Sequence, residues 1–165
     1  MSGNRKNSVR NGGSGFNRGR LDVMLGYQLR LAYIATSRHF ATALSRVDLT
    51  QKQTGVLWLI GANAGASQIA LATELGMDRA SMMVIIDRLE ERGLIVRERS
   101  ARDGRRQELY LTAKGRKTLS QCKAAVARHE RWIAGRFKRG QASELMRSLQ
   151  RLATDAGRHP APDRP

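Results

Sequence analysis

Apolar and polar residues follow a helical period between residues 67 and 93, and the rest of the chain is organised around this stretch. Ser67 and Asp78 stand at N-cap positions, because their side-chain oxygens can accept a hydrogen bond from a free amide of the first turn. Gly76 and Gly93 stand where a helix commonly ends in a left-handed residue. The pattern therefore predicts two short helices joined by a tight turn.

Each of these two helices is predicted to bury one face. In the first, the apolar positions are Ile69, Ala72 and Leu75. In the second, residues 79 to 92, they recur at i, i+3, i+4 and i+7 as Met82, Ile85, Ile86 and Leu89. The opposite face carries Arg79, Ala80, Met83, Val84 and Asp87. Such a helix can enter a DNA major groove, although an ordinary helical hairpin in an all-α core has the same pattern.

The next residues predict a β-hairpin. LIVRERS (94–100) alternates apolar and charged residues, which indicates a half-buried strand. ARDGRR turns the chain, and QELYLT (107–112) returns as the second strand. The tip is basic and carries Arg102, Arg105 and Arg106. Two helices followed by a basic hairpin form a winged helix-turn-helix.

This region resembles the MarR family of bacterial transcription regulators. The resemblance rests on LTQKQTGVLWLI (49–60), SQIALATELGMDRASMMVIIDRLEERGLIVR (67–97) and a wing that ends in Leu111-Thr112. It implies a mainly α fold, a winged helix-turn-helix with long N- and C-terminal dimerisation helices and one β-hairpin wing. It also implies a ligand-responsive repressor of a catabolic or efflux operon that leaves a palindromic operator when a small molecule binds.

The segment before the winged unit has two parts. Residues 1–20 are rich in Gly, Asn, Ser and Arg and contain no acid, so we expect a disordered basic arm. Both a solvated tail without a dedicated role and an arm that strengthens DNA binding fit this composition. Residues 21–47 predict one long amphipathic helix. Thr50 and Gln53 then form a capping-box pattern for the next helix.

The winged unit is predicted to span residues 48–112, and two further helices follow in 113–157. Residues 158–165 form a Pro-rich tail that is expected to fray. The apolar stripes of 21–47 and 113–157 are more than one such domain can cover. We therefore expect these helices to pack against the same helices of a second copy in a two-fold homodimer. The alternative is a monomer in which these helices fold onto the winged domain.

Charge is the strongest feature of the composition. The chain has 30 Lys and Arg against 14 Asp and Glu, a net charge of +16, which predicts a polyanionic partner. No apolar run approaches the roughly 20 residues that span a bilayer, and no secretory signal precedes the folded part. The single cysteine excludes an internal disulfide and suits a reducing compartment. We therefore expect a cytoplasmic protein that binds double-stranded DNA and no membrane.

The predicted DNA contacts come from the two short helices and the wing: Ser67, Gln68, Asp78, Arg79, Ala80, Ser81, Met83, Val84, Arg88, Arg102, Arg105 and Arg106. Many relatives carry Thr and Arg where this chain has Met83 and Val84. Apolar side chains cannot form bidentate contacts with guanine, but they can pack on thymine methyl groups. Ser81 and Arg88 are then the predicted polar contacts of the helix. The resemblance makes Arg105 the minor-groove or inner structural arginine of the wing.

Family members commonly bind small aromatic acids, and some bind a coenzyme A thioester of such an acid. An aromatic wall with a few polar anchors suits a flat acid. The candidate contacts in this chain are Tyr27, Arg30, Tyr33, Arg38, Trp58 and His129.

Other sensing mechanisms and other functions have less support. Cys122 lies on an apolar seam without a second cysteine, so a buried, inert thiol is expected. His39, His129 and His159 are scattered and predict no metal site or cofactor. No phosphate loop, nucleophile motif or paired carboxylates indicate an enzyme. The alternative is a charge-driven, sequence-indifferent binder of the nucleoid or of RNA, which would lose all affinity together as salt rises.

Overall fold

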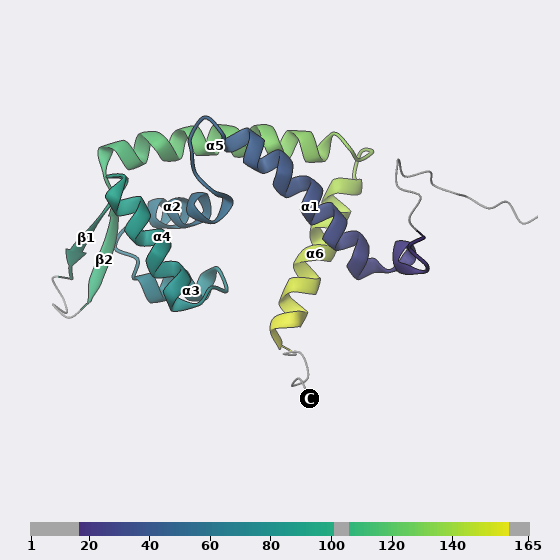
Figure 1. The fold of residues 1–165 in the computed structure, drawn as a ribbon, viewed down its shortest axis with the longest axis horizontal. Helices are drawn as coiled ribbons and strands as arrows, with labels where there is room; N and C mark the ends of the chain where they lie inside the picture. The colour runs from purple at the N-terminus through teal and green to yellow at the C-terminus, as the bar shows by residue number, and fades with distance from the viewer. Residues whose placement is uncertain (1–16, 101–105, 159–165) are drawn as a thin grey trace, which may run out of the picture. The chain divides into compact units, whose positions relative to one another are not determined.

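The computed structural model describes residues 17–100 and 106–158, with side chains described as far as residue 154. Its elements are the 3₁₀ turn η1, helices α1 to α6 and strands β1 and β2 (Figure 1). The chain divides into two units, residues 1–35 and residues 36–165. Within the described residues, no helix is both long enough and apolar enough to cross a membrane.

The predicted helix over residues 21–47 is wrong at both ends. Residues Leu21–Val23 form η1, and Met24 adopts an extended backbone before α1 begins, so that α1 spans Leu25–Leu44. At the other end, the amides of Val47 and Asp48 both donate to the carbonyl of Leu44, which closes a turn. Asp48 then takes a left-handed φ of +52°, which an α-helix cannot continue through. In α1, Leu44 alone is fully buried among the described side chains.

Helix α2 (Gln51–Ala62) starts at the predicted capping box, which is confirmed. The Thr50 hydroxyl accepts from the Gln53 amide at 3.2 Å, and the Gln53 side chain accepts from the Thr50 amide at 2.9 Å. Such a cap stabilises a helix by about 1 kcal/mol. Val56, Leu57 and Ile60 are buried on this helix, whereas Trp58 faces outward.

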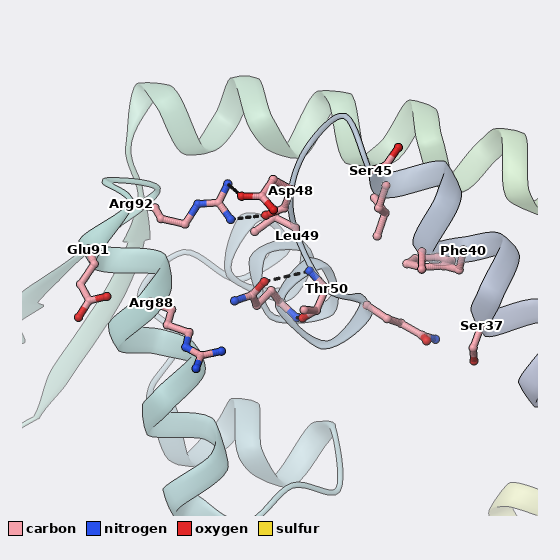
Figure 2. Close-up of a pocket in the computed structure, with 13 residues that line it drawn as sticks. Ser37, Phe40, Ser45, Asp48, Leu49, Thr50, Arg88, Glu91 and Arg92 are labelled. Atoms are coloured by element: carbon pink, nitrogen blue, oxygen red, sulfur yellow. Dashed lines mark hydrogen bonds and ion pairs between the residues drawn. The ribbon is translucent and has the colours of Figure 1, made fainter.

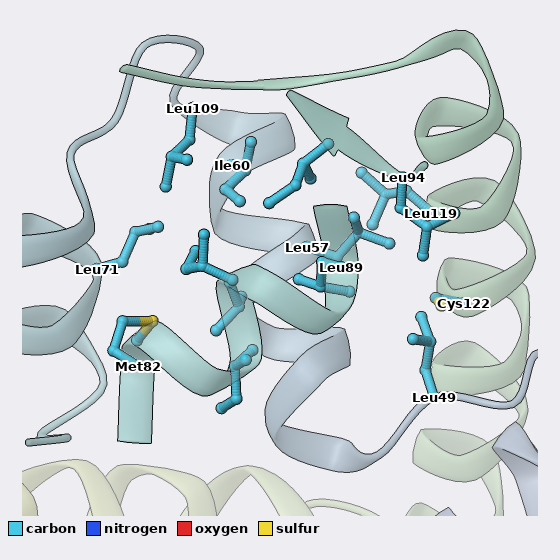
Figure 3. Close-up of a cluster of buried hydrophobic side chains, with 14 of the residues drawn as sticks. Leu49, Leu57, Ile60, Leu71, Met82, Leu89, Leu94, Leu109, Leu119 and Cys122 are labelled. Atoms are coloured by element: carbon cyan, nitrogen blue, oxygen red, sulfur yellow. The ribbon is translucent and has the colours of Figure 1, made fainter. Parts of the chain in front are cut away.

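Three further helices, α3 (Gln68–Glu74), α4 (Arg79–Glu91) and α5 (Ala113–Ala134), follow α2. The hydrophobic core lies among α2, α3, α4, the hairpin and the first half of α5 (Figure 3). It gathers side chains that are far apart in the sequence, from Leu44 to Ala125. The prediction for helix α3 (Gln68–Glu74) is wrong in part. Its buried residues are Leu71 and Ala72, whereas Ile69 is 57% and Leu75 37% exposed. The helix has only seven residues, which is too short for a repeating apolar stripe. Its two buried residues are therefore set by contact with α4 and β2.

Strands β1 (Ile95–Arg99) and β2 (Gln107–Leu111) pair antiparallel, as predicted, with Ile95 opposite Leu111 and Arg99 opposite Gln107. An isolated bridge joins Ala66 to Leu109, so the linker before α3 adds a short third edge to the hairpin. Leu109 is buried, and this side of the hairpin closes the core.

Helix α5 (Ala113–Ala134) is capped by Thr112, whose hydroxyl accepts from the Gly115 amide at 2.9 Å. Gly115 lies so close to the Leu94 carbonyl that a Cβ at this position would overlap the carbonyl oxygen. Helix α5 ends at Ala134, and Gly135 follows it as the C-cap. Helix α6 (Gln141–Arg158) follows, and its described side chains are exposed except for the half-buried Ala142.

Candidate nucleic-acid interface

Helix α4 (Arg79–Glu91) begins at Asp78, as predicted, after a turn in which Gly76 has a φ of +59°. The Asp78 carboxylate accepts a hydrogen bond from the Ser81 amide at 2.7 Å. This hydrogen bond lowers the pKa of the Asp78 carboxyl group, which therefore stays ionised at the positive end of the helix dipole. The carboxylate of Asp78 thus serves as the cap that sets where α4 starts.

The two faces of α4 differ as the sequence predicts. Met82, Ile85, Ile86 and Leu89 are buried in the core. On the other side Ala80 is exposed, Met83 is 50% exposed and Val84 is 47% exposed. Positions separated by three or four residues lie side by side on a helix, so these three side chains form one apolar patch. We call Ala80, Met83 and Val84 the apolar patch of α4.

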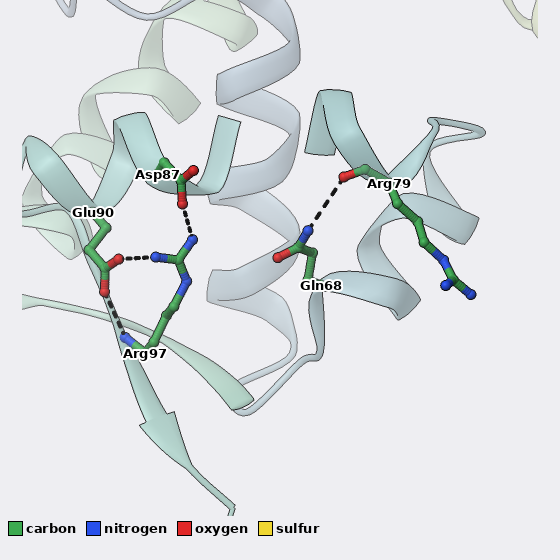
Figure 4. A network of polar contacts seen from close by, with 5 residues as sticks. All are labelled: Gln68, Arg79, Asp87, Glu90 and Arg97. Atoms are coloured by element: carbon green, nitrogen blue, oxygen red, sulfur yellow. Dashed lines mark hydrogen bonds and ion pairs between the residues drawn. The ribbon is translucent and has the colours of Figure 1, made fainter. Parts of the chain in front are cut away.

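Arg97 on β1 holds the hairpin against α4 (Figure 4). Its guanidinium forms ion pairs with the carboxylates of Asp87 and Glu90, and its backbone amide donates to Glu90 Oε1 at 3.3 Å. Two acidic groups of α4 are thereby neutralised beside the apolar patch. Sequence reasoning missed this residue, although the alternation in LIVRERS places Arg97 on the same side of the strand as Ile95 and next to the helix.

The junction between α3 and α4 is also tied. The Gln68 side-chain amide donates to the Arg79 carbonyl at 3.4 Å, whereas the Arg79 guanidinium points away from this contact (Figure 4). The Ser67 hydroxyl accepts from the Ala70 amide at 3.2 Å and caps α3, as predicted. Arg79 is therefore exposed at the start of α4 and able to meet an anion, while Ser67 and Gln68 have structural contacts of their own.

The wing is described only in part. Arg102 and Arg105 lie outside the described residues. Arg106 is exposed at the start of the returning strand, and its carbonyl accepts from the Ser100 amide at 2.9 Å. Of the three wing arginines predicted to contact DNA, Arg106 is thus the one that the described structure places.

Arg88 has a different setting from the apolar patch. It lines a cavity of about 640 Å³ between the second half of α1, the start of α2 and the end of α4 (Figure 2). Phe40 and Leu49 contribute apolar surface to this cavity. Arg92 lines it as well, but Arg92 is held by an ion pair with Asp48 at 3.6 Å and by a hydrogen bond to the Val47 carbonyl at 3.3 Å. Arg88, which the sequence predicts as a polar contact to DNA, therefore lies at the edge of a cavity.

The six predicted effector contacts do not line this cavity. Tyr27, Arg30 and Tyr33 lie on the first half of α1, where Tyr27 is half-buried and the other two are exposed. Arg38 is exposed on the second half of α1. The exposed ring of Trp58 lies under the Lys123 ammonium, at 5.2 Å from the ring centroid. These assignments remain predictions.

His129 is brought next to His39, a pairing that the sequence did not predict. The two Nδ1 atoms are 2.8 Å apart, and Trp132 stacks on His39 with ring centroids 3.9 Å apart. Burial, with a smaller contribution from His39, lowers the pKa of His129. Among the residues that the structure describes, no third ligand joins this pair to form a metal site. The predicted burial of the thiol is confirmed: Cys122 is fully buried, and burial raises the pKa of its thiol.

Comparisons with known proteins agree with this architecture. A model of the MarR family matches residues 47–106. A putative transcriptional regulatory protein for the hcr operon of Thauera aromatica is 36% identical over 138 residues, which are 83% of this chain and 83% of that protein. The transcriptional repressor CouR bound to a 23-mer DNA duplex superposes with a TM-score of 0.80 at 39% identity, covering 85% of this chain and 99% of CouR.

A second structure of CouR, bound to p-coumaroyl-CoA, superposes with a TM-score of 0.77 at 38% identity and covers 83% of this chain and 96% of CouR. The matched regions include α4, the hairpin and the helices on either side of them. The chain belongs to the MarR family of transcriptional regulators.

Proposed function

We propose that this protein is a homodimeric, ligand-responsive repressor that acts in the cytoplasm and binds a near-palindromic DNA operator. The observation that carries the proposal is helix α4, which is anchored by one buried face and offers the other face to the exterior. A helix presented in this way can lie in the major groove, while a hairpin beside it follows the phosphate backbone. CouR, which is 39% identical to this chain, binds a DNA duplex with the same fold.

Charge supports the same proposal. The net charge of +16 favours association with phosphate, and Arg79 and Arg106 are exposed on either side of the apolar patch along the chain. The ion pairs of Arg97 remove two acidic groups that would repel a phosphate backbone. A protein that binds DNA by charge alone would not need these ion pairs, because such binding does not depend on a fixed angle between α4 and the hairpin.

Dimerisation is supported by α6. Its leucines and Met146 are exposed along one side of an amphipathic helix, and a second copy would cover them. Two copies of α4 would then reach successive major grooves about one helical turn apart, which predicts an inverted repeat.

The experiment is a footprint on the DNA upstream of the gene for this protein and of its neighbours, followed by titrations of the protected sequence at increasing salt. A regulator should protect an inverted repeat and keep its preference for this sequence over a scrambled duplex while both affinities fall. Equal affinity for both duplexes at every salt concentration would instead support the sequence-indifferent alternative.

For the effector, we propose an aromatic acid or its coenzyme A thioester. CouR binds p-coumaroyl-CoA, and the cavity beside Arg88 combines apolar walls with a guanidinium that suits a carboxylate or a phosphate. An effector releases the protein from DNA only if it binds the free dimer better than the DNA-bound dimer.

Calorimetric titration with p-coumaroyl-CoA, p-coumarate and coenzyme A tests this assignment. Ala41 lines the cavity, so Ala41→Trp should weaken binding of the active compound by about tenfold or more, because the new side chain occupies the space. Ala62→Trp is the control, since Ala62 is exposed at the end of α2 and does not line the cavity. If Ala41→Trp binds as the natural protein does, the effector lies elsewhere, and the six residues predicted from the sequence are the next candidates.

A further inference from the structure

We propose that α4 recognises its half-site chiefly through thymine C5-methyl groups, which contact Met83 and Val84. The inference rests on the proposed function, because it requires α4 to lie in the major groove. It goes beyond that function by naming the chemical group that distinguishes the operator from other DNA.

The first observation is the composition of the outward face of α4. Positions 80, 83, 84 and 87 are spaced so that their side chains lie together on one side of the helix. Three of the four are the apolar patch, with Met83 and Val84 about half exposed. Large apolar side chains exposed in a cluster indicate a surface that is covered in a complex.

The second observation concerns the fourth position. Asp87 could accept a hydrogen bond from the amino group of cytosine, which is the usual base contact of an acidic side chain. Its carboxylate is instead paired with Arg97, which turns it toward β1 (Figure 4). The centre of the face therefore presents apolar surface.

The third observation is the location of the polar side chains of α4. Guanine is usually recognised by an arginine or a lysine, and adenine by an asparagine or a glutamine. Arg79 lies at the first position of the helix, where an arginine commonly meets a phosphate. Arg88 lines the cavity beside α1 and α2 (Figure 2). The Ser81 side chain forms a hydrogen bond with the Asp78 carboxylate at the cap, and asparagine and glutamine do not occur in residues 79–91.

Since the polar side chains of α4 are placed elsewhere, the apolar patch must recognise an apolar feature of the major groove. Of the four bases, thymine alone presents a methyl group there, and apolar side chains contact it without leaving a polar group unpaired. Exposed positive residues on α4 and on the hairpin make DNA the occupant, since an apolar protein partner would have to bury the charges of Arg79 and Arg106. Methionine adds a flexible side chain that can follow the edge of a base step.

The test replaces thymine by deoxyuridine in the footprinted operator, because deoxyuridine lacks the C5-methyl group and keeps every hydrogen-bonding group. Burial of one methyl group corresponds to about a fourfold change in affinity. We expect deoxyuridine at one or two thymines in each half-site to weaken binding by about fourfold each. Deoxyuridine outside the protected region should have no effect.

Variants of the protein then assign the contact. In Met83→Ala or Val84→Ala, the deoxyuridine duplex and the natural duplex should bind about equally at the corresponding position, because the methyl group has lost its partner. Ile69→Ala is the matched control, since Ile69 is an equally exposed apolar residue on α3. This variant should keep the fourfold difference at those positions.

Each outcome is decisive. If an operator with deoxyuridine at every thymine binds as tightly as the natural operator, the inference is wrong, although the proposed repressor function stands. If sensitivity to deoxyuridine persists unchanged in both Met83→Ala and Val84→Ala, thymine is recognised by other residues and the assignment is wrong. Failure to prefer any operator over scrambled DNA would overturn the proposed function itself.

Discussion

Helices α4 and α6 both carry an apolar stripe, but only one of the two stripes is buried within the chain. On α4, Met82, Ile85, Ile86 and Leu89 are each at most 9% exposed. On α6, the apolar residues Leu145, Met146, Leu149 and Leu152 are between 40 and 53% exposed. A stripe in the sequence therefore identifies a face that must be covered, without identifying what covers it. The α4 stripe is covered by the core of the chain itself, and the α6 stripe is what a second copy would cover.

The largest expected effect comes from a charge placed in the α6 stripe. Leu149→Asp would bury a carboxylate in the proposed dimer interface, which is strongly unfavourable, so we expect dissociation into single chains. Because two linked half-site contacts give far tighter binding than one, affinity for the operator should fall by more than about a hundredfold. Analytical ultracentrifugation and gel-shift titration measure the two effects.

Thr154→Asp is the control for this prediction, because it places the same charge on the opposite side of α6, where Thr154 is exposed. This variant should remain a dimer. A Leu149→Asp protein that is still dimeric would show that α6 is not the dimer contact.

The next largest effect is expected where α5 packs closely on the core of the chain. Gly115→Ala should destabilise the protein by about 3 kcal/mol, because the new methyl group overlaps the Leu94 carbonyl and either the backbone of β1 or that of α5 must move. Gly55→Ala is the matched helical control, since its Cβ would meet only Leu75 at an ordinary 3.9 Å. Urea denaturation should separate the two variants clearly, and equal midpoints would contradict the close approach of α5.

The local features of the fold could be predicted from the sequence. The capping box at Thr50, the caps at Asp78 and Thr112 and the buried face of α4 all depend on residues a few positions apart. The ends of α1 could not be predicted in this way. Its amphipathic period continues through Leu21 and Val47, but the chain turns at Met24 and at Asp48 because of backbone conformation rather than hydrophobicity.

Contacts between segments that lie far apart in the chain could not be predicted from the sequence. Arg97 pairs with Asp87 and Glu90 because the hairpin folds back on α4, and His39 meets His129 across 90 positions of the chain. Periodicity assigns a side chain to a face, but it does not say which other side chain lies opposite. For α3, where only seven residues form the helix, the predicted face was wrong in part, since Ala72 is buried but Ile69 and Leu75 are exposed.

The ion pairs of Arg97 fix the orientation of the hairpin on α4 and add little to the buried core. Arg97→Ala should reduce affinity for the operator by about tenfold, because the hairpin would lose its fixed position and two acids would be unpaired near the phosphate backbone. The free energy of unfolding should change by at most about 1 kcal/mol, since the ion pairs are partly exposed. Fluorescence anisotropy and thermal unfolding measure the two quantities.

Arg99→Ala is the control for Arg97→Ala, because it removes the same charge from the same strand at an exposed position. Its effect on affinity should be about threefold or less, as expected for one phosphate contact at moderate salt. Equal losses in the two variants would mean that Arg97 acts through its charge alone.

The smallest effect concerns His129, which is buried in the second half of α5 and packs against His39 and Phe40. Burial lowers the pKa of His129 below its ordinary value of 6.5, so the folded protein keeps this ring neutral while the unfolded chain takes up a proton. The free energy of unfolding should therefore be at its full value above pH 6.5 and should fall as the pH is lowered from there. For one group the slope is at most about 1.4 kcal/mol per pH unit.

His129→Phe keeps an aromatic ring but removes the titrating group, so its unfolding free energy should change less between pH 7 and pH 5.5. Glu130 and Arg136 remain in both proteins, which restricts the difference between the two slopes to the imidazole and its contact with His39. Equal slopes in the two proteins would show that His129 takes up its proton as readily in the folded chain as in the unfolded chain.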